Sequence, residues 1–313
     1  MRAVTIRDGG VVVAEHPDPQ PGRGQLLVSV RAAGLNGADM LQVAGRYPPP
    51  QDAPADIPGL ELAGEVVAVG PGASRFEVGQ RVMSLVDGGA QAELALVQER
   101  LALHVPERVA WEQAGGFPEA FTTAHDALFT QCSLGLGQRL CVHAAAGGVG
   151  LAAVQLGLAT GASVTATVRR AEHRAALAAL GAEVVAPEAF VDAGPFDVIL
   201  ELVGGPNIPA DLDALAVGGR IVVIGVLAGA QADLDLRKLM ARRGRISAST
   251  LRARPLESKA TATRGVEAQV LPLLASKALR VPVFATFPLT DAPAAYSLFA
   301  AGGKLGKIVL TGQ

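Results

Sequence analysis

Charged and aromatic residues are scarce in this chain. Of its 313 residues, 18% are charged and 4% are aromatic, whereas 50% are hydrophobic. So much apolar material can form a large core, which excludes an intrinsically disordered protein, and the length is sufficient for two domains. The formal net charge of −2 argues against a nucleic acid or an anionic membrane surface as the main partner.

Two further absences concern metals and location. Cys132 and Cys141 are the only cysteines, and they form no CxxC motif and have no histidine at metal-ligand spacing. A structural zinc or a disulfide framework is therefore not expected, although a redox sensor using these thiols is an open alternative. The first ten residues, MRAVTIRDGG, carry charges and no apolar run, so we expect a cytoplasmic protein without a secretory signal.

The segment from Leu140 to Arg170 is the most informative part of the sequence. An apolar run is followed by a glycine-rich turn, a long Ala/Leu segment and a β-branched run that ends in two arginines. This order predicts a strand, a tight turn, a helix beginning near Val149 and a second strand. Such glycines let a diphosphate approach the backbone amides, and the helix N-terminus attracts the phosphates. The predicted dinucleotide-binding residues are Gly147, Gly148, Val149 and Gly150.

The same segment also fits a membrane span or a purely structural turn. No charged residue occurs between Leu140 and Val168, a length that is sufficient to cross a membrane. The glycines and the clustering of β-branched residues favour a buried parallel strand and its crossover helix, which are nearly charge-free because both faces of the sheet are covered. A glycine turn without a ligand is the weaker alternative, because strand, turn, helix and second strand all occur in the order of a nucleotide-binding unit.

The end of the second predicted strand bears on the choice of cofactor. NAD sites usually have Asp or Glu about 20 residues beyond the first glycine, where it binds the ribose 2′-hydroxyl. Here Arg169 and Arg170 occupy that region, and no carboxylate occurs before Glu172. Because guanidinium groups pair well with phosphate, NADPH is predicted over NADH, with Arg174 as a third contact. The alternative is a pair of solvated arginines in a loop.

Residues 1–118 have a pattern of their own and are predicted to form a β domain. Short alternating or β-branched runs are separated by turns rich in glycine and proline, as in a barrel or sandwich. The prolines that follow Tyr47 exclude a helix there and indicate a loop. The strand-like runs are Leu26–Ala32, Gly64–Val69, Arg81–Val86 and Gln91–Val97.

From Gln138 onward, strand-like runs alternate with Ala/Leu-rich helical segments. Six such runs complete a doubly wound parallel sheet, so we predict a cofactor-binding domain over residues 119–258. The runs are Leu140–Ala144, Ser163–Val168, Glu183–Val185, Asp197–Leu202, Arg220–Val226 and Ile246–Thr250. Residues 259–313 do not continue the alternation. Their helical (266–275, 292–300) and strand-like (282–288, 307–310) segments are expected to pack back onto the first domain.

Seven motifs occur in order along nearly the whole chain. They are AAGLNGADM (32–40), PGLELAGEVVAVGPGASRFEVGQRV (58–82), FTTAHDAL (121–128), HAAAGGVG (143–150), GGRIVVIG (218–225), STLRAR (249–254) and GKIVL (306–310). This set resembles the zinc-free quinone oxidoreductases (zeta-crystallin-like) of the medium-chain dehydrogenase/reductase superfamily. The resemblance implies an α/β protein with a GroES-like β-barrel catalytic domain, a Rossmann cofactor domain and a C-terminal segment that returns to the catalytic domain.

The chain departs from the zinc alcohol dehydrogenases of that superfamily. Those enzymes have Cys where this chain has Asn36 and His where it has Leu60, and their cysteine-rich structural-zinc loop is missing here. An amide and a leucine cannot replace a thiolate and an imidazole on Zn²⁺. We therefore expect no metal, and reduction of an acceptor that needs little activation, such as a quinone or an activated alkene.

By resemblance, three residues belong to the catalytic cleft. Asn36 is expected near the nicotinamide or the substrate, and Thr123 beside the nicotinamide. Tyr47 is expected in a loop facing the cleft, where its phenol can bond a substrate carbonyl or donate a proton. The alternatives are that Asn36 is a turn asparagine and that Tyr47 packs on its neighbouring prolines.

The resemblance also implies further cofactor contacts. Gly225, Val226 and Leu227 follow the fifth strand of the cofactor domain and resemble a segment whose backbone contacts the carboxamide, and Leu251 follows the sixth. Lys307 resembles a lysine that approaches the 2′-phosphate or closes the cleft, although a solvated lysine at a strand start explains it equally well.

Together these features predict an NADPH-dependent, zinc-independent oxidoreductase that transfers hydride to a quinone. An enone or enoyl-thioester reductase is the alternative, for which Tyr47 matters more as a proton donor. A crystallin-like or nucleic-acid-binding role is a third alternative, and the net charge disfavours nucleic acid. The resemblance further implies a homodimer that pairs through the edge strand near Ile246–Thr250.

Overall fold

The computed structural model describes residues 1–312 and divides into two compact units. Unit 1 comprises Met1–Thr122 together with the chain from Arg252 on, and unit 2 comprises Thr123–Leu251. The predicted boundaries after residues 118 and 258 differ from these by a few residues. The first boundary falls inside α3 (Pro118–His125), and the second assigns Arg252 and the residues after it to unit 1.

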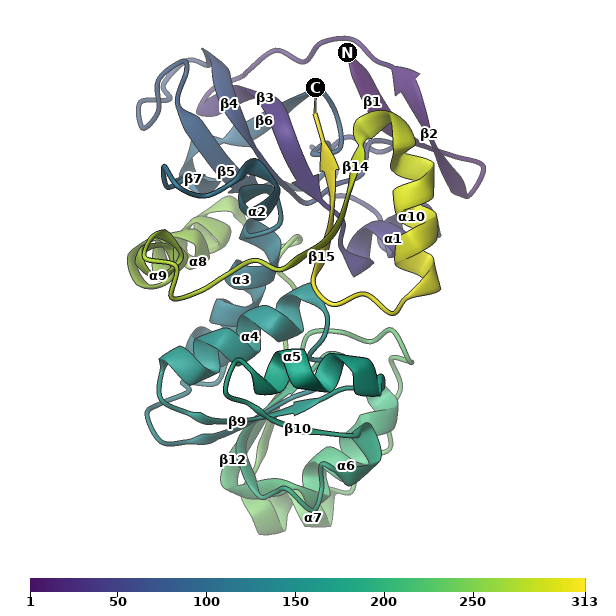
Figure 1. The fold of residues 1–313 in the computed structure, drawn as a ribbon, viewed down its shortest axis with the longest axis vertical. Coiled ribbons are helices and arrows are strands. Elements are labelled where there is room, and N and C mark those ends of the chain that lie inside the picture. Colours follow the sequence, from purple (N-terminus) through teal and green to yellow (C-terminus); the bar gives the residue numbers. More distant parts are fainter. Residues whose placement is uncertain (313) are drawn as a thin grey trace. The chain divides into compact units, whose positions relative to one another are not determined.

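Unit 2 is built on a six-stranded parallel sheet with the order β10-β9-β8-β11-β12-β13. Helices α4 and α5 cover one face of this sheet, and α6 and α7 cover the other (Figure 1). The strands are β8 (Arg139–Val142), β9 (Ser163–Thr167), β10 (Glu183–Val185), β11 (Phe196–Glu201), β12 (Leu215–Val223) and β13 (Arg245–Ala248). The helices are α4 (Gly148–Ala159), α5 (Arg174–Ala178), α6 (Ile208–Asp213) and α7 (Leu236–Arg242).

This strand order is that of a doubly wound, Rossmann-type sheet, so the predicted fold of the cofactor domain is confirmed. The charge-free run Leu140–Val142 is completely buried, because helices pack on both faces of its strand. The membrane interpretation of this segment is wrong. Among residues 1–312, no helix is long and apolar enough to cross a membrane.

Unit 1 contains a seven-stranded sheet in which β14-β15-β3-β4-β5-β7 are neighbours and β6 pairs with β3. Strand β15 pairs antiparallel with β3, so the C-terminal segment joins the sheet built by the N-terminal part of the chain. The strands are β3 (Gln25–Gly34), β4 (Glu61–Val69), β5 (Arg81–Leu85), β6 (Leu94–Gln98), β7 (Ala102–His104), β14 (Val283–Pro288) and β15 (Lys307–Thr311).

A hairpin at the start of unit 1 is absent from the sequence prediction. Strands β1 (Arg2–Arg7) and β2 (Gly10–Glu15) pair antiparallel through a two-residue turn. Asp8 and Gly9 both have positive φ, 51° and 73°, and an Asp-Gly pair between apolar runs is a strong hairpin signal. This signal was available in the sequence and would have found the hairpin.

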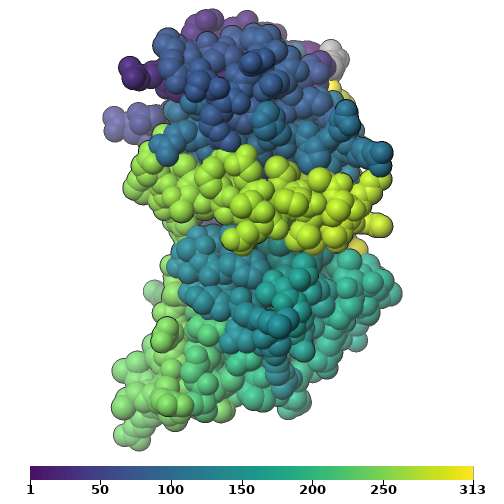
Figure 2. Space-filling view, turned by 90° about the vertical axis from the view of Figure 1, so that its left-hand side faces the viewer, coloured from purple at the N-terminus to yellow at the C-terminus, as the bar shows by residue number. Residues whose placement is uncertain are grey.

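The helices of unit 1 are α1 (Gly37–Val43), α2 (Trp111–Gly115), α8 (Leu256–Gln269), α9 (Leu271–Ala275) and α10 (Ala292–Ala301). The predicted helix over 266–275 was too short, because α8 begins ten residues earlier in a polar stretch with weak apolar periodicity. Helix α8 lies along β7, and Arg264 donates a hydrogen bond of 3.0 Å to the carbonyl oxygen of Ala102. Figure 2 shows this yellow-green segment against the blue part of unit 1.

An apolar cluster joins the N-terminal and C-terminal parts of unit 1. It contains residues of β1, α10 and β15. Its members include Val4, Leu35, Ala295, Tyr296 and Ile308. Because Leu35 lies directly before Asn36, the N-cap residue of α1, this cluster positions the N-terminus of that helix. The predicted site residues Asn36 and Lys307 lie directly beside Leu35 and Ile308 in the chain.

Candidate active site

The beginning of the glycine turn in unit 2 leaves space for a ligand to approach the backbone. Gly147 precedes the first turn of α4, which contains no acidic residue, and is half-buried with its nearest potential Cβ neighbour 3.6 Å away. A Cβ on Gly150 would instead lie 2.7 Å from backbone atoms of Ala144 and Ala145. Packing therefore requires the glycine at 150 but not the one at 147. A diphosphate at the helix N-terminus fits this arrangement, which also contains Gly148 and Val149.

The three predicted phosphate-binding arginines are all exposed. Arg169 and Arg170 follow β9, whose carboxyl end lies beside that of β8 and hence at the sheet edge that carries the glycine turn. Arg170 forms an exposed ion pair of 3.2 Å with Glu172, and Arg174 begins α5. The preference for NADPH stays a prediction.

Beneath the glycine turn, His143 lies in a buried polar network that sequence reasoning did not find. Its Nε2 is 2.9 Å from Asp211 Oδ1, and its Nδ1 is 3.1 Å from Thr167 Oγ1. Burial opposes a charge on His143, yet its hydrogen bonds to Asp211 and Cys141 raise its pKa well above the ordinary value. The ligand atoms of His143, Glu201 and Asp211 lie within 4.8 Å of one another. These three residues could therefore hold a metal ion, while in the structure His143 and Asp211 are hydrogen-bonded to each other.

Glu201 connects this network to the loops at the carboxyl ends of β11 and β12. Its carboxylate accepts hydrogen bonds from the backbone N–H groups of Val203 and Gly204 and from Asn207 Nδ2. Its burial raises its pKa. Glu201 thus fixes the turn that follows β11.

That turn packs against the segment of Gly225, Val226 and Leu227. A Cβ on Gly225 would lie 2.6 Å from the carbonyl oxygen of Leu202, so glycine is needed there. Val226 and Leu227 are 45% and 69% exposed, which leaves this part of the loop open to a ligand. The other two predicted contacts of unit 2, Thr123 and Leu251, are buried at 9% and 8% exposure.

In unit 1, the structure brings Asn36 and Lys307 together with Glu61. The Lys307 ammonium lies 2.5 Å from Glu61 Oε1, 2.6 Å from Asn36 Oδ1 and 2.9 Å from the carbonyl oxygen of Leu35. The Asn36 amide in turn donates to Glu61 Oε1 at 3.0 Å. Lys307 is 4% exposed and Glu61 is fully buried. The interpretation of Lys307 as a solvated lysine is therefore wrong.

All three ammonium hydrogens of Lys307 have acceptors in this cluster. A contact of Lys307 with the cofactor would require one of these hydrogen bonds to break, and that role stays a prediction. Leu60, at the other position where the zinc enzymes have a ligand, is 2% exposed. A lysine ammonium in contact with Asn36 and Glu61, next to an aliphatic side chain, is not the ligand set that zinc prefers, and the absence of zinc stays a prediction.

Asp39 completes the polar end of α1. It is fully buried, and it accepts hydrogen bonds from the backbone N–H of Asn36 at 2.8 Å and of Gly59 at 3.2 Å. Burial raises its pKa to about 6, against the lowering effect of these bonds and of Lys307. Asn36 is thereby held through both its backbone and its side chain, which is more than a simple turn asparagine requires.

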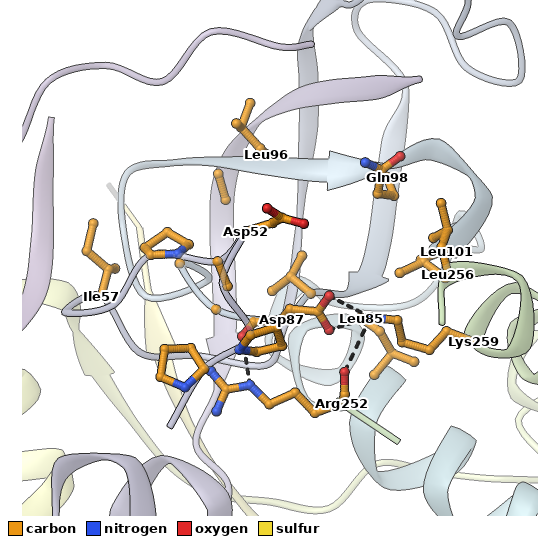
Figure 3. A pocket seen from close by; sticks show the side chains of 18 of the residues that line it. Asp52, Ile57, Leu85, Asp87, Leu96, Gln98, Leu101, Arg252, Leu256 and Lys259 are labelled. Carbon is orange, nitrogen blue, oxygen red and sulfur yellow. Dashed lines mark hydrogen bonds and ion pairs between the residues drawn. The ribbon is translucent and has the colours of Figure 1, made fainter. Parts of the chain in front are cut away.

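A pocket of about 650 Å³ opens in unit 1 beside the Tyr47 loop (Figure 3). At its border, Arg252 donates to the carbonyl oxygens of Asp87 and Tyr47 and to Gln42 Oε1. Its guanidinium carbon lies 5.3 Å from the centre of the Tyr47 ring. Lys259 and Asp87 form an ion pair of 2.5 Å nearby.

The half-buried Tyr47 has a phenol that stays protonated at neutral pH. Burial raises its pKa, and Glu119 adds to the effect while Arg252 opposes it. The predicted description of Tyr47 as a proton donor rather than a base agrees with this direction. Sequence reasoning quoted Arg252 within STLRAR but gave it no role. The signal that could have found it was a charged residue within a recognised motif, close to the predicted domain boundary after residue 258.

Two family models match this chain. One describes a zinc-binding dehydrogenase and matches residues 146–310, and the other describes the GroES-like domain of alcohol dehydrogenases and matches residues 22–129. With its Rossmann-type sheet and its GroES-like domain, the chain belongs to the medium-chain dehydrogenase/reductase superfamily. The predicted fold class is thereby confirmed.

Individual relatives include a polyketide synthase component, alcohol dehydrogenases and a quinone oxidoreductase. The erythronolide synthase EryA2 of Saccharopolyspora erythraea is 37% identical over 97% of this chain, which spans only 8% of that protein. A mycobacterial protein complexed with NADPH is 28% identical, with a TM-score of 0.88 over 99% of this chain and 100% of the other. A mycobacterial quinone oxidoreductase is 29% identical, with a TM-score of 0.86 over 99% of both chains. The chain thus spans a small fraction of its polyketide synthase relative.

Proposed function

We propose that this protein is an NADPH-dependent, zinc-independent reductase of quinones. The observation that carries the proposal is the cluster of Lys307, Asn36 and Glu61. An ammonium already supplies positive charge between the carboxylate and the amide, and the neighbouring Leu60 offers no ligand atom. Alcohol oxidation in this superfamily relies on a Lewis acid that polarises the alcohol oxygen, whereas a quinone accepts hydride without one.

The glycine turn supports the cofactor part of the proposal. Gly147, Gly148 and Val149 would hold the diphosphate at the N-terminus of α4, and Arg169 and Arg170 would hold the 2′-phosphate. NADPH, once bound, supplies a hydride, so that a quinone, NADPH and a proton give a hydroquinone and NADP⁺. The similarity to a mycobacterial protein complexed with NADPH is in line with this choice.

The residues of the protein itself orient the acceptor. Asn36, fixed by Lys307, Glu61 and Asp39, presents a rigid polar surface at the start of α1. The protonated phenol of Tyr47 can donate a hydrogen bond to a carbonyl oxygen of the acceptor. The catalytic role of Thr123, which belongs to unit 2, rests on the resemblance alone.

Reduction of an enone or an enoyl thioester is the second candidate function. The observation that favours it is the 37% identity with a polyketide synthase, a type of enzyme that builds chains from acyl thioesters. Enolate formation at such a substrate is followed by protonation of carbon, for which Tyr47 is a candidate donor. Replacement of Tyr47 by Phe should then abolish turnover of an enoyl thioester, while quinone reduction should survive.

Stopped-flow oxidation of NADPH with a simple quinone and with an enoyl thioester tests both candidates, with NADH in parallel. Fast turnover with the quinone supports the first proposal, and turnover with the thioester alone supports the second. A protein that binds NADPH but oxidises it with neither class of acceptor would refute both. A filter-binding assay at physiological salt tests the remaining nucleic-acid alternative.

We also propose a cytoplasmic homodimer. Strand β13 is an edge of the unit 2 sheet, and an edge strand can pair with that of a second copy across a two-fold axis. Analytical ultracentrifugation of the protein, and of a variant with Ser247→Pro on this strand, would show whether dimers form and whether they require β13. Cell fractionation tests the location.

A further inference from the structure

The pocket beside the Tyr47 loop combines one cationic border with an apolar wall, and the proposed function does not account for either. Its volume of about 650 Å³ is in the range of pockets that bind drug-sized ligands. The apolar wall is lined by Ile57, Leu85, Leu94, Leu96, Leu101 and Leu256. In Figure 3, the Arg252 side chain lies at the lower border, and Leu96 and Gln98 lie on the opposite side.

Arg252 has no carboxylate partner within ion-pair distance among residues 1–312. Its three hydrogen bonds go to neutral oxygens, those of Asp87 and Tyr47 in the backbone and of Gln42 in the side chain. These bonds use Nε and one hydrogen on each terminal nitrogen. A guanidinium carries five N–H donors, so one hydrogen on each terminal nitrogen remains for a ligand. The residue is only 6% exposed, and a buried cation without a counter-charge favours an electron-rich oxygen beside it.

The other charges around Arg252 do not replace such a ligand. Asp87 is nearest, but its carboxylate pairs with Lys259 at 2.5 Å and 2.6 Å. Asp39 and Glu119 act on Arg252 only from beyond ion-pair distance. The Lys259–Asp87 pair therefore contributes little net charge. Asp52 and Arg254, of opposite charge, also line the pocket, and Arg252 is the buried cation of this lining that has no carboxylate partner among residues 1–312.

We propose that Arg252 binds the carbonyl oxygen of a substrate whose apolar tail lies along the leucines of the pocket. The chemical class is a carbonyl compound with an alkyl or acyl chain, such as an alkyl-substituted quinone or a medium-chain acyl thioester. This inference rests on the proposed reductase function and specifies its substrate. The guanidinium donates its remaining hydrogens to that one oxygen, and its carbon lies 5.3 Å from the centre of the Tyr47 ring. Burial of the chain against Leu94, Leu96 and Leu101 adds affinity in proportion to the apolar area covered.

The test uses the full chain without cofactor and a probe that cannot be reduced. Isothermal titration calorimetry compares S-decanoyl-N-acetylcysteamine with its S-acetyl homologue. We expect the decanoyl thioester to bind at least tenfold more tightly than the acetyl thioester. Arg252→Met should weaken the binding of the decanoyl probe at least tenfold, with Arg252→Lys between it and the wild type. Exposed Arg7 on the β1–β2 hairpin provides the control Arg7→Met, which should bind as the wild type does.

A second variant tests the tail independently of the guanidinium, in case Arg252→Met does not fold. Leu96→Trp places a larger side chain in the pocket and should remove the advantage of the decanoyl probe while leaving acetyl binding unchanged. The control is Leu136→Trp at a position that is 84% exposed in unit 2. Equal binding of both probes to the wild type, or a folded Arg252→Met with unchanged affinity, would overturn the inference.

Measurements of NADPH oxidation with different acceptors distinguish failure of this inference from failure of the proposed function. If NADPH is oxidised by 1,4-benzoquinone but a decyl-substituted benzoquinone has no lower KM, the function stands and the pocket assignment fails. If the decanoyl probe binds in an Arg252-dependent manner while no quinone or enoyl thioester is reduced, the pocket assignment stands and the reductase proposal fails.

Discussion

The two units hold their candidate residues in different ways. In unit 2, the glycine turn and the arginines lie within one continuous βαβ stretch, from β8 to the residues after β9. In unit 1, the contacts of the site join residues that are far apart in the sequence, such as Lys307 with Asn36 and Arg252 with Gln42. The first arrangement depends on local geometry, and the second depends on the sheet that brings β3, β4 and β15 together. Mutations should therefore affect stability more in unit 1 and cofactor affinity more in unit 2.

The largest effect is expected for Lys307→Met. This change leaves Glu61 as a buried carboxylate without its cation, which should lower the free energy of unfolding by about 3–5 kcal/mol. Trp111 is the only tryptophan and lies in unit 1, so its fluorescence in urea reports the unfolding of that unit. The double variant Lys307→Met/Glu61→Gln should recover a large part of the loss.

The matched control lies in unit 2. Lys238 forms an exposed ion pair with Asp213, and Lys238→Met should cost less than about 1 kcal/mol. If Lys307→Met is no less stable than the wild type, the buried pair is not what holds the unit 1 site, and the contrast between the units fails.

The next effect concerns the pH dependence of stability at Asp39. Its pKa is about 6 in the folded protein, above the ordinary 3.8, because the carboxyl is buried. The folded state therefore keeps a proton that the unfolded state loses as the pH rises. The stability from Asp39 is complete below pH 4 and falls by about 3 kcal/mol between pH 4 and pH 6.

Asp39→Asn removes this titration. Urea unfolding of both proteins at several pH values should give a wild-type-minus-variant difference that declines through this window and is flat above it. A difference that is independent of pH would show that Asp39 titrates normally.

Within unit 2, substitutions of two glycines of the turn should have different effects on cofactor binding and on stability. Gly147→Ala meets only ordinary contacts and should fold normally, yet weaken NADPH binding about 100-fold if the diphosphate approaches there. Gly150→Ala overlaps the backbone of Ala144 and Ala145, so it should lower the unfolding temperature as well. Protein fluorescence on NADPH titration and thermal circular dichroism separate the two effects. Normal NADPH affinity of Gly147→Ala would make the turn purely structural.

The smallest effect is expected for the arginines after β9. The double variant Arg169→Ser/Arg170→Ser should lower NADPH affinity about tenfold and leave NADH affinity unchanged, because only NADPH has a 2′-phosphate. Exposed Arg237 on α7 provides the control Arg237→Ser, which should change neither. Equal losses for both cofactors would contradict the assignment and leave the fold unaffected.

How much of the structure could be predicted from the sequence differs between these regions for a physical reason. The βαβ unit was predicted because strand, turn and helix are encoded by neighbouring residues, and parallel strands buried on both faces must be apolar. The β1–β2 hairpin also carried a local signal, the Asp8-Gly9 turn. In contrast, α8 was misplaced because it buries polar and small residues such as Lys259 and Thr263, which periodicity does not detect.

The sequence by itself determined the doubly wound sheet and the glycine turn, and its resemblance to a known family predicted that Asn36 and Leu60 stand where other members have zinc ligands. Only the tertiary structure decided that Lys307 is a buried partner of Asn36 and Glu61, and that Arg252 borders a pocket with an apolar wall. The reason is the range of the interactions. Backbone conformation and burial follow from residues close together in the chain, whereas the charge of a lysine or arginine acquires a role only from the partners that the fold places around it.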